Sequence, residues 1–70
     1  MKIYEAVQNG VWYRAYITTA YWKDREEYCL EIKAQYDAFS RWQPVLSKTF
    51  LTKSGVRNRM KKYATDWRLV

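Results

Sequence analysis

The stretch "KIYEAVQNGVWYRAYITT", Lys2–Thr19, decides the fold that we expect for this chain. Two runs rich in aromatic and β-branched residues flank Asn9-Gly10, the dipeptide that best tolerates the positive φ angles of a type I′ hairpin turn. This turn sets the register, in which Val7 faces Trp12, Glu5 faces Arg14 and Ile3 faces Tyr16 on one side of the ribbon. The other side carries Tyr4, Ala6, Tyr13, Ala15 and Ile17. The chain is therefore expected to begin with a β-hairpin.

The segment "DREEYCLEIKAQYDAFSRW", Asp24–Trp42, fits two kinds of element. Read with period two, its apolar residues share one face of a half-buried strand: Tyr28, Leu30, Ile32, Ala34 and Tyr36. Read with helical period, an acidic cap at Asp24 precedes an apolar stripe from which Leu30 points away. We favour the strand over residues 24–40, because the alternation runs without a break, and the helix stays as the alternative.

The C-terminal part predicts a strand and then a helix. Pro44 is barred from a central strand, so the strand is expected at Val45–Leu51. Thr52 or Ser54 can then cap a helix that runs to about the chain end. Its inward face would carry Val56, Met60, Tyr63, Ala64 and Trp67. The sequence thus predicts one compact α+β domain over residues 1–70, with an antiparallel sheet of three or four strands packed against a C-terminal helix.

Composition argues against several classes of function. The chain has 70 residues with one cysteine and no histidine, which excludes an intramolecular disulfide and the usual zinc sites. Without a histidine base or a Gly-rich phosphate loop we expect no enzyme, and neither a cofactor nor a bound metal. We expect Cys29 to be a buried or half-buried small residue. No apolar run has the length of a membrane span or a signal core, so a cytoplasmic protein is expected.

The positive charge is concentrated in the C-terminal half. The net charge is +6, yet residues 1–37 carry five basic and six acidic side chains, whereas residues 38–70 carry eight basic side chains and one acidic one. Such polarity suggests an anionic partner, and nucleic acid is the commonest one inside cells. DNA is favoured over RNA.

The predicted helix carries cations that helix stability does not explain. If Val56 and Met60 face the core, Arg57 and Lys61 lie together on one flank, where they repel each other at i, i+4. Arg57 would also stand in the first turn, where positive charge opposes the helix dipole. We therefore expect a surface that faces phosphates. The candidate contacts are Arg57, Lys61 and Arg68 on one flank of the helix, Arg59 and Lys62 on the other flank, and Lys48 and Lys53 in the strand and cap that lead into it.

The hairpin interleaves aromatic and basic residues as Trp12, Arg14 and Tyr16, which are candidates for groove or base contact. Ordinary sheet packing is the competing interpretation, because Arg14 has Glu5 across the strand and Trp12 lies beside Val7. If this face is exposed, its apolar area would equally suit a protein partner or a second copy of the chain.

Two blocks, "GVWYRAYI" (10–17) and "LSKTFLTKSGVRNRMKKYATDW" (46–67), resemble the small N-terminal arm-type DNA-binding domain of phage and transposon tyrosine integrases. The resemblance implies three antiparallel strands with a helix behind them, and a sheet that enters the DNA major groove. The matching positions are Gly10, Trp12, Arg14, Lys48, Thr49, Phe50, Thr52 and Lys53.

Our first hypothesis is a small basic accessory protein of phage type that binds nucleic acid through its C-terminal half. The alternative is a phage-encoded inhibitor, of anti-CRISPR or anti-host type, that binds and blocks a host protein or nucleoprotein complex. A third hypothesis is a homo-oligomer that assembles through the aromatic ribbon.

Overall fold

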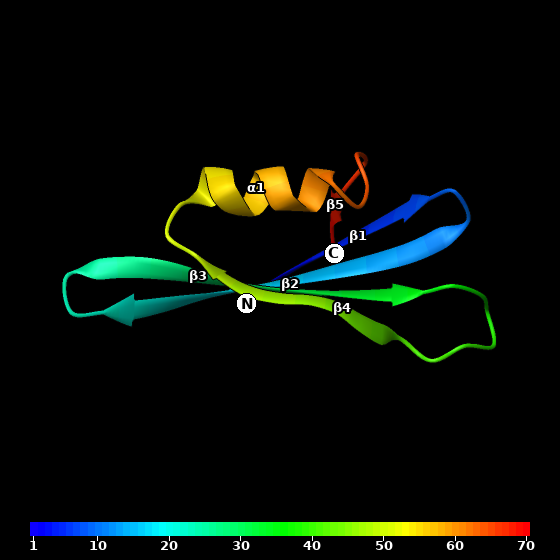
Figure 1. The fold of residues 1–70 in the computed structure, drawn as a ribbon, viewed down its shortest axis with the longest axis horizontal. Helices are drawn as coiled ribbons and strands as arrows, with labels where there is room; N and C mark the ends of the chain where they lie inside the picture. The colour runs from blue at the N-terminus through cyan, green and yellow to red at the C-terminus, as the bar shows by residue number, and fades with distance from the viewer.

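The chain folds as one antiparallel sheet with a helix on one side. The computed structural model describes all 70 residues. The elements are β1 (Lys2–Gln8), β2 (Val11–Trp22), β3 (Arg25–Gln35), β4 (Gln43–Phe50), α1 (Lys53–Lys61) and β5 (Arg68–Leu69). The strand order is β4-β3-β2-β1-β5, and α1 lies against a single face of the sheet (Figure 1). The predicted α+β class is confirmed, with a fifth strand beyond the expected three or four.

The N-terminal hairpin has the register that the sequence predicts. Asn9 and Gly10 both take positive φ angles, 53° and 77°, as a type I′ turn requires. Glu5 pairs with Arg14, and the neighbouring pairs follow in step. The turn chemistry and the alternation agree at every position, so nothing else competes for this register.

The ambiguous segment 24–40 is a strand, as favoured. Leu30 and Ile32 of β3 are the largest fully buried side chains in the structure. The strand ends at Gln35, before Tyr36, and a turn follows. In this turn the Asp37 carboxylate accepts hydrogen bonds from the Phe39 backbone N–H at 2.9 Å and the Ser40 hydroxyl at 2.7 Å.

The strand β4 differs from the expected Val45–Leu51, because it begins at Gln43, includes Pro44 and ends at Phe50. Pro44 is tolerated since β4 is an edge strand, whose outer side needs no hydrogen-bond partner. The register against β3 shifts between Ile32 and Lys33, next to the proline.

The helix begins where the sequence predicts and ends earlier. Thr52 is the N-cap, and its hydroxyl accepts a hydrogen bond from the Gly55 N–H at 3.1 Å. The predicted continuation to the chain end is wrong, because α1 stops at Lys61. The indole Nε1 of Trp67 donates to the carbonyls of Met60 at 3.1 Å and Ala64 at 2.9 Å. The indole is thus the donor to the Ala64 carbonyl, and at the Met60 carbonyl it joins the backbone N–H groups of Tyr63 and Ala64. These contacts hold the helix end where the chain turns back toward β5.

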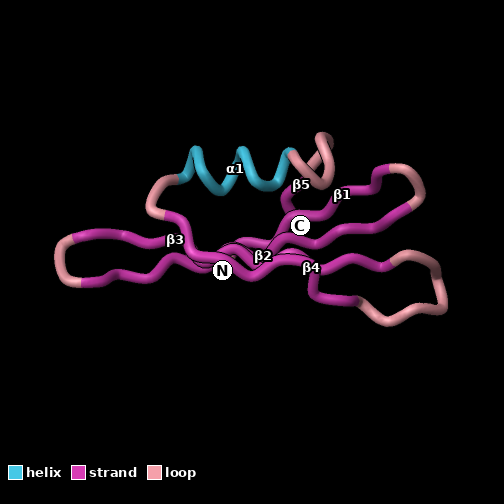
Figure 2. The backbone as a smooth tube through the Cα atoms, viewed as in Figure 1, coloured by secondary structure: helices cyan, strands magenta, loops and turns pink.

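The sheet has two unlike faces. The helix face bears α1 and all eight buried residues, which are Ala6, Ala15, Leu30, Ile32, Ala34, Val56, Met60 and Ala64. Tyr63 and Trp67, also predicted to point inward, are half-buried and pack against this core. The opposite surface, here called the open face, carries the odd-numbered residues of β1 and β3 and the even-numbered residues of β2, and no helix covers it (Figure 2). The expectation of burial for Cys29 is wrong, because this residue lies exposed on the open face.

The β2–β3 hairpin projects beyond the rest of the sheet. Lys2 of β1 pairs with Ile17, and Phe50 of β4 pairs with Tyr28, so residues 20–27 form a ribbon of two strands alone. This ribbon lies at one end of the long axis of the molecule, which measures 43 Å (Figure 1). The one helix is too short to cross a membrane.

Candidate nucleic-acid interface

Three cations lie in a row along α1. Lys53, Arg57 and Lys61 occupy positions i, i+4 and i+8, so they follow one another on the same side of the helix over about 12 Å. The residues that face the core from α1 are Val56 and Met60. The row is exposed along its whole length, with its charges directed to solvent.

Two further cations gather around Phe50, where the end of β4 meets α1. The Lys48 Nζ lies 5.4 Å from the centre of the Phe50 ring, and the Arg59 Cζ lies 5.8 Å from it. Lys48 belongs to the helix face because it pairs with the buried Leu30. Gly55 lets the helix approach this ring closely, since a Cβ there would lie 3.1 Å from the Phe50 Cδ1. Phe50 thus holds one end of β4, the first turn of α1 and two cations together.

We call the six cations on this side the basic helix surface: Lys48, Lys53, Arg57, Arg59, Lys61 and Lys62. None of them forms an ion pair. The four ion pairs of the molecule use Arg14, Arg25, Lys33 and Arg68 instead. Four of the 13 cations are thus neutralised by acids of the chain itself, and nine are left for solvent or a ligand, six of them on the basic helix surface and the others at Lys2, Lys23 and Arg41.

Helix electrostatics explains part of the basic helix surface and leaves the rest unexplained. The prediction that Arg57 stands in the first turn is wrong, because α1 begins at Lys53. Lys53 is in that turn, which contains no acid, so its charge opposes the helix dipole. Arg59 and Lys61 lie in the last turn of the shortened helix, where the dipole favours cations. The unfavourable features are Lys53 and the two like-charged i, i+4 pairs, Lys53 with Arg57 and Arg57 with Lys61.

Arg68 does not join the helix cations, contrary to the prediction that it lies on one flank with Arg57 and Lys61. It belongs to β5 and pairs with Glu5 of β1, which places it on the open face. Its guanidinium lies 3.7 Å from the Asp66 carboxylate. The error follows from the early end of α1, since the residues after Lys61 no longer keep helical spacing.

The hairpin candidates Trp12, Arg14 and Tyr16 also lie on the open face, opposite to the basic helix surface. The Arg14 Nε donates to Glu5 Oε1 at 2.9 Å, and the Arg14 Cζ lies 4.7 Å from the centre of the Trp42 ring. The adjoining Tyr16 hydroxyl and the Glu5 carboxylate raise the pKa of Arg14 above its ordinary value. The ten candidate residues are thus split between two surfaces, and one flat ligand cannot contact both.

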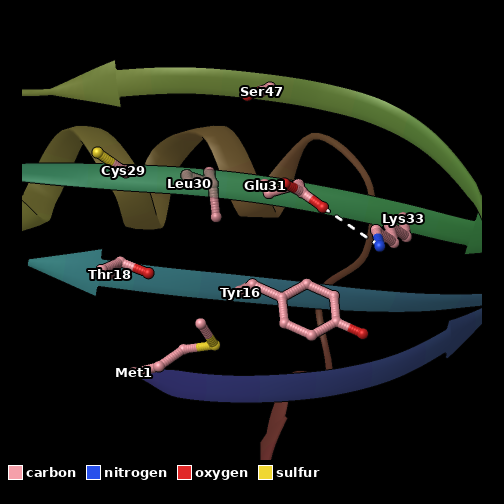
Figure 3. A pocket seen from close by; sticks show the side chains of 8 residues that line it. All are labelled: Met1, Tyr16, Thr18, Cys29, Leu30, Glu31, Lys33 and Ser47. Atoms are coloured by element: carbon pink, nitrogen blue, oxygen red, sulfur yellow. Dashed lines mark ion pairs between the residues drawn. The ribbon is translucent and has the colours of Figure 1, made fainter.

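The open face is polar and aromatic in its centre. The Lys33 Nζ lies 3.4 Å from Glu31 Oε1 and 5.4 Å from the centre of the Tyr16 ring. Beside them is a shallow depression of about 250 Å³, with Met1 and Cys29 at its margin (Figure 3). The hairpin register predicted that Arg14 and Tyr16 lie on the same side of the ribbon. The contacts of Arg14 with Trp42 and of Tyr16 with Lys33 were not predicted from the sequence.

Comparisons with protein families, curated proteins and solved structures find no match to this chain. No group of three or more cysteine, aspartate or glutamate side chains gathers at any point where a metal ion could be held. The features with chemical consequence are the two surfaces described above.

Proposed function

We propose that the protein binds nucleic acid through the basic helix surface, with DNA favoured over RNA. The observation that carries this proposal is the absence of any ion pair at the six cations of that surface, while the cations of the open face are paired. Cations without internal partners can neutralise phosphates and release their counterions without first breaking contacts within the protein.

Lys53, Arg57 and Lys61 would follow one phosphate backbone, since they succeed one another at intervals of about 6 Å along α1. Lys48 and Arg59, on either side of Phe50, would extend the contact beside this row. Contacts of this kind fix position on the nucleic acid and carry no sequence information. The expected activity is sequence-independent, salt-sensitive binding.

The proposal is tested by measuring the affinity for a 20-base-pair DNA duplex, its single strand and the RNA duplex of the same sequence over a series of salt concentrations. The key variant combines Lys53→Gln, Arg57→Gln and Lys61→Gln. If all three residues contact phosphates, the slope of log affinity against log salt becomes shallower by about 2.7 for the DNA duplex.

A matched control removes the same net charge elsewhere, through Lys23→Gln, Arg25→Gln and Arg41→Gln. These three exposed residues lie in the β2–β3 turn, at the start of β3 and in the β3–β4 loop, away from α1. The control should change the slope by less than about one unit. Equal losses in the two triple variants, or no binding of any of the three nucleic acids at low salt, would overturn the proposal.

A second candidate function is supported by the projecting ribbon, residues 20–27. Tyr21 and Trp22 are 75% and 60% exposed near its tip, and three acids stand among two cations there. An acidic tip with aromatic anchors suits a protein pocket better than a phosphate backbone. The protein would then bind and block a host protein or nucleoprotein complex. Loss of a captured host protein when Tyr21→Ser and Trp22→Ser are combined would support this candidate, and unchanged capture would contradict it.

A further inference from the structure

The open face is a side of the sheet that no helix covers, in a molecule whose surface is large for its mass. Every buried residue lies on the helix side of the sheet, while Trp12 and Val7 of the open face are about half exposed. The accessible surface of the molecule is 5,320 Å² at 8.6 kDa. Folded monomers of that mass average roughly 4,700 Å². The excess of roughly 600 Å², to which the projecting ribbon also contributes, approaches the roughly 800 Å² that one partner loses in a standard protein interface.

We infer that the open face is the interface at which a second copy of this chain binds. The two sheets would pack face to face, as in a β-sandwich, about 10 Å apart. Because the same surface is used by both copies, the contact closes on itself and yields a dimer. Each α1 then lies on an outer side of the dimer.

The charges favour a dimer that packs open face against open face over one that packs helix face against helix face. On the open face each of the three β2 and β3 cations has an acid in contact: Arg14 with Glu5, Arg25 with Glu27 and Lys33 with Glu31. The charges of this surface balance, so the two contacting surfaces do not repel each other, although each whole copy still carries a net charge of +6. The helix faces, by contrast, carry the unpaired cations and repel each other.

The chemistry of the open face also resembles the core of a protein interface. Trp, Tyr and Arg are the residues that most often dominate binding energy there. On this face Arg14 is held between Glu5 and Trp42, and Tyr16 lies under Lys33. These side chains are already fixed by contacts within one copy, so little conformational entropy is lost when they are covered. The depression beside Tyr16 (Figure 3) offers room for a protruding side chain of the other copy, and Trp12 is the exposed candidate.

The test is the mass in solution from about 1 µM to about 1 mM, measured by sedimentation equilibrium without nucleic acid. A dimer doubles the mass of 8.6 kDa within this range. The variant Trp12→Glu should weaken the dimer at least about tenfold, because it places an unpaired charge in the interface. The control Phe39→Glu changes a residue of the β3–β4 loop that is 99% exposed and should leave the dissociation constant unchanged. Circular dichroism verifies that both variants fold.

Cys29 gives an independent measurement, because it is the single cysteine and lies exposed on the open face. Its alkylation by a maleimide should slow at concentrations at which the dimer forms. A dimer joined through edge strands or ribbons would leave this rate unchanged, and that result would overturn the inference. So would a strict monomer at about 1 mM.

The salt dependence separates this inference from the proposed function. Each copy carries a net charge of +6, so added salt screens the repulsion between copies and should tighten the dimer. Binding of nucleic acid should weaken under the same change. The triple glutamine variant of the helix row should therefore lose the duplex and keep the dimer, and each hypothesis can fail alone.

Discussion

Arg14 and Glu5 face each other across β1 and β2, with the Arg14 Nε donating to Glu5 Oε1 at 2.9 Å. Trp42, which is distant in sequence, lies over the same guanidinium at 4.7 Å. The arginine that the hairpin pattern offered as a groove contact is thus held by an acid and an aromatic ring of its own chain. Its role in the fold is to tie the β3–β4 loop to the N-terminal hairpin.

Replacement of Arg14 by alanine should therefore reduce stability and spare nucleic-acid binding. The ion pair is about one-third exposed, so it contributes only a few tenths of a kcal/mol, and the stacking on Trp42 adds a comparable amount. We expect the free energy of unfolding to fall by about 1 kcal/mol, seen as a lower urea midpoint at unchanged slope. Arg41→Ala, which removes a loop cation without an ion pair, is the control. A marked loss of duplex affinity in Arg14→Ala alone would assign the open face to nucleic acid.

Trp67 closes the helix end, so Trp67→Phe should destabilise the fold even though a large ring remains. The phenyl ring cannot donate, so the Ala64 carbonyl would lose its donor, while the Met60 carbonyl would still accept from the backbone N–H groups of Tyr63 and Ala64. We expect a loss of about 1–2 kcal/mol in the free energy of unfolding, with faster amide exchange at residues 61–64. Trp22→Phe, at an exposed ribbon position, should change stability by less than about 0.5 kcal/mol. Equal effects of the two substitutions would contradict the capping role of Trp67.

The elements that follow from local pattern could be predicted from the sequence. Asn9-Gly10 determines the hairpin, and the unbroken alternation through Leu30 and Ile32 determines β3. The end of α1 could not be predicted, because apolar residues keep helical spacing through Trp67 and only the tertiary contact of its indole shows that the helix has already stopped. The two-residue strand β5 is too short to show an alternating pattern in the sequence. It forms because it pairs with the free edge of β1.

The sequence predicted most of the residues that form the candidate site, but it did not predict how they are arranged in space. Six of the eight cations of the C-terminal half gather on one side. The exceptions are Arg41, in the β3–β4 loop, and Arg68, which the early helix end transfers to β5. Sequence alone could not show which face of the hairpin α1 covers, since both carry aromatic residues. That choice depends on packing volume: the small Ala6, Ala15 and Ala34 leave space for the helix, whereas Trp12 and Tyr16 would fill it.

The turn after β3 should respond to acid through Asp37. The Ser40 hydroxyl and the Phe39 backbone N–H donate to its carboxylate and hold the pKa below its ordinary value of 3.8. Because the folded pKa is the lower one, this turn is stabilised above pH about 4 and loses that stabilisation as pH falls through the folded pKa.

A carboxyl carbon titration by NMR measures this pKa directly. Ser40→Ala removes the largest cause and should move the Asp37 midpoint up toward 3.8, while the Phe39 N–H still keeps it lower. Ser47→Ala, on β4 and remote from this turn, should leave the midpoint where it is. If Ser40→Ala does not raise the midpoint, the hydroxyl is not what stabilises the charged carboxylate.

Lys53 should show opposite effects on stability and on binding. It stands in the first turn of α1, against the helix dipole and four residues before Arg57. Lys53→Glu removes that repulsion and creates a favourable i, i+4 pair with Arg57, so the free energy of unfolding should rise by about 0.5–1 kcal/mol. The same change should lower duplex affinity, because an acid then stands at the start of the row that we propose to face phosphates.

Lys53→Gln separates the two contributions. It should raise stability by only a few tenths of a kcal/mol and make the salt slope shallower by about 0.9, the value for one lost phosphate contact. Greater stability with unchanged duplex affinity in both variants would mean that α1 does not face the nucleic acid. A loss of both stability and duplex affinity is expected only if Lys53 makes a stabilising contact within the fold. The structure shows no acidic partner for its ammonium group. The proposed contact with a phosphate would explain why a lysine that costs stability stands at this position.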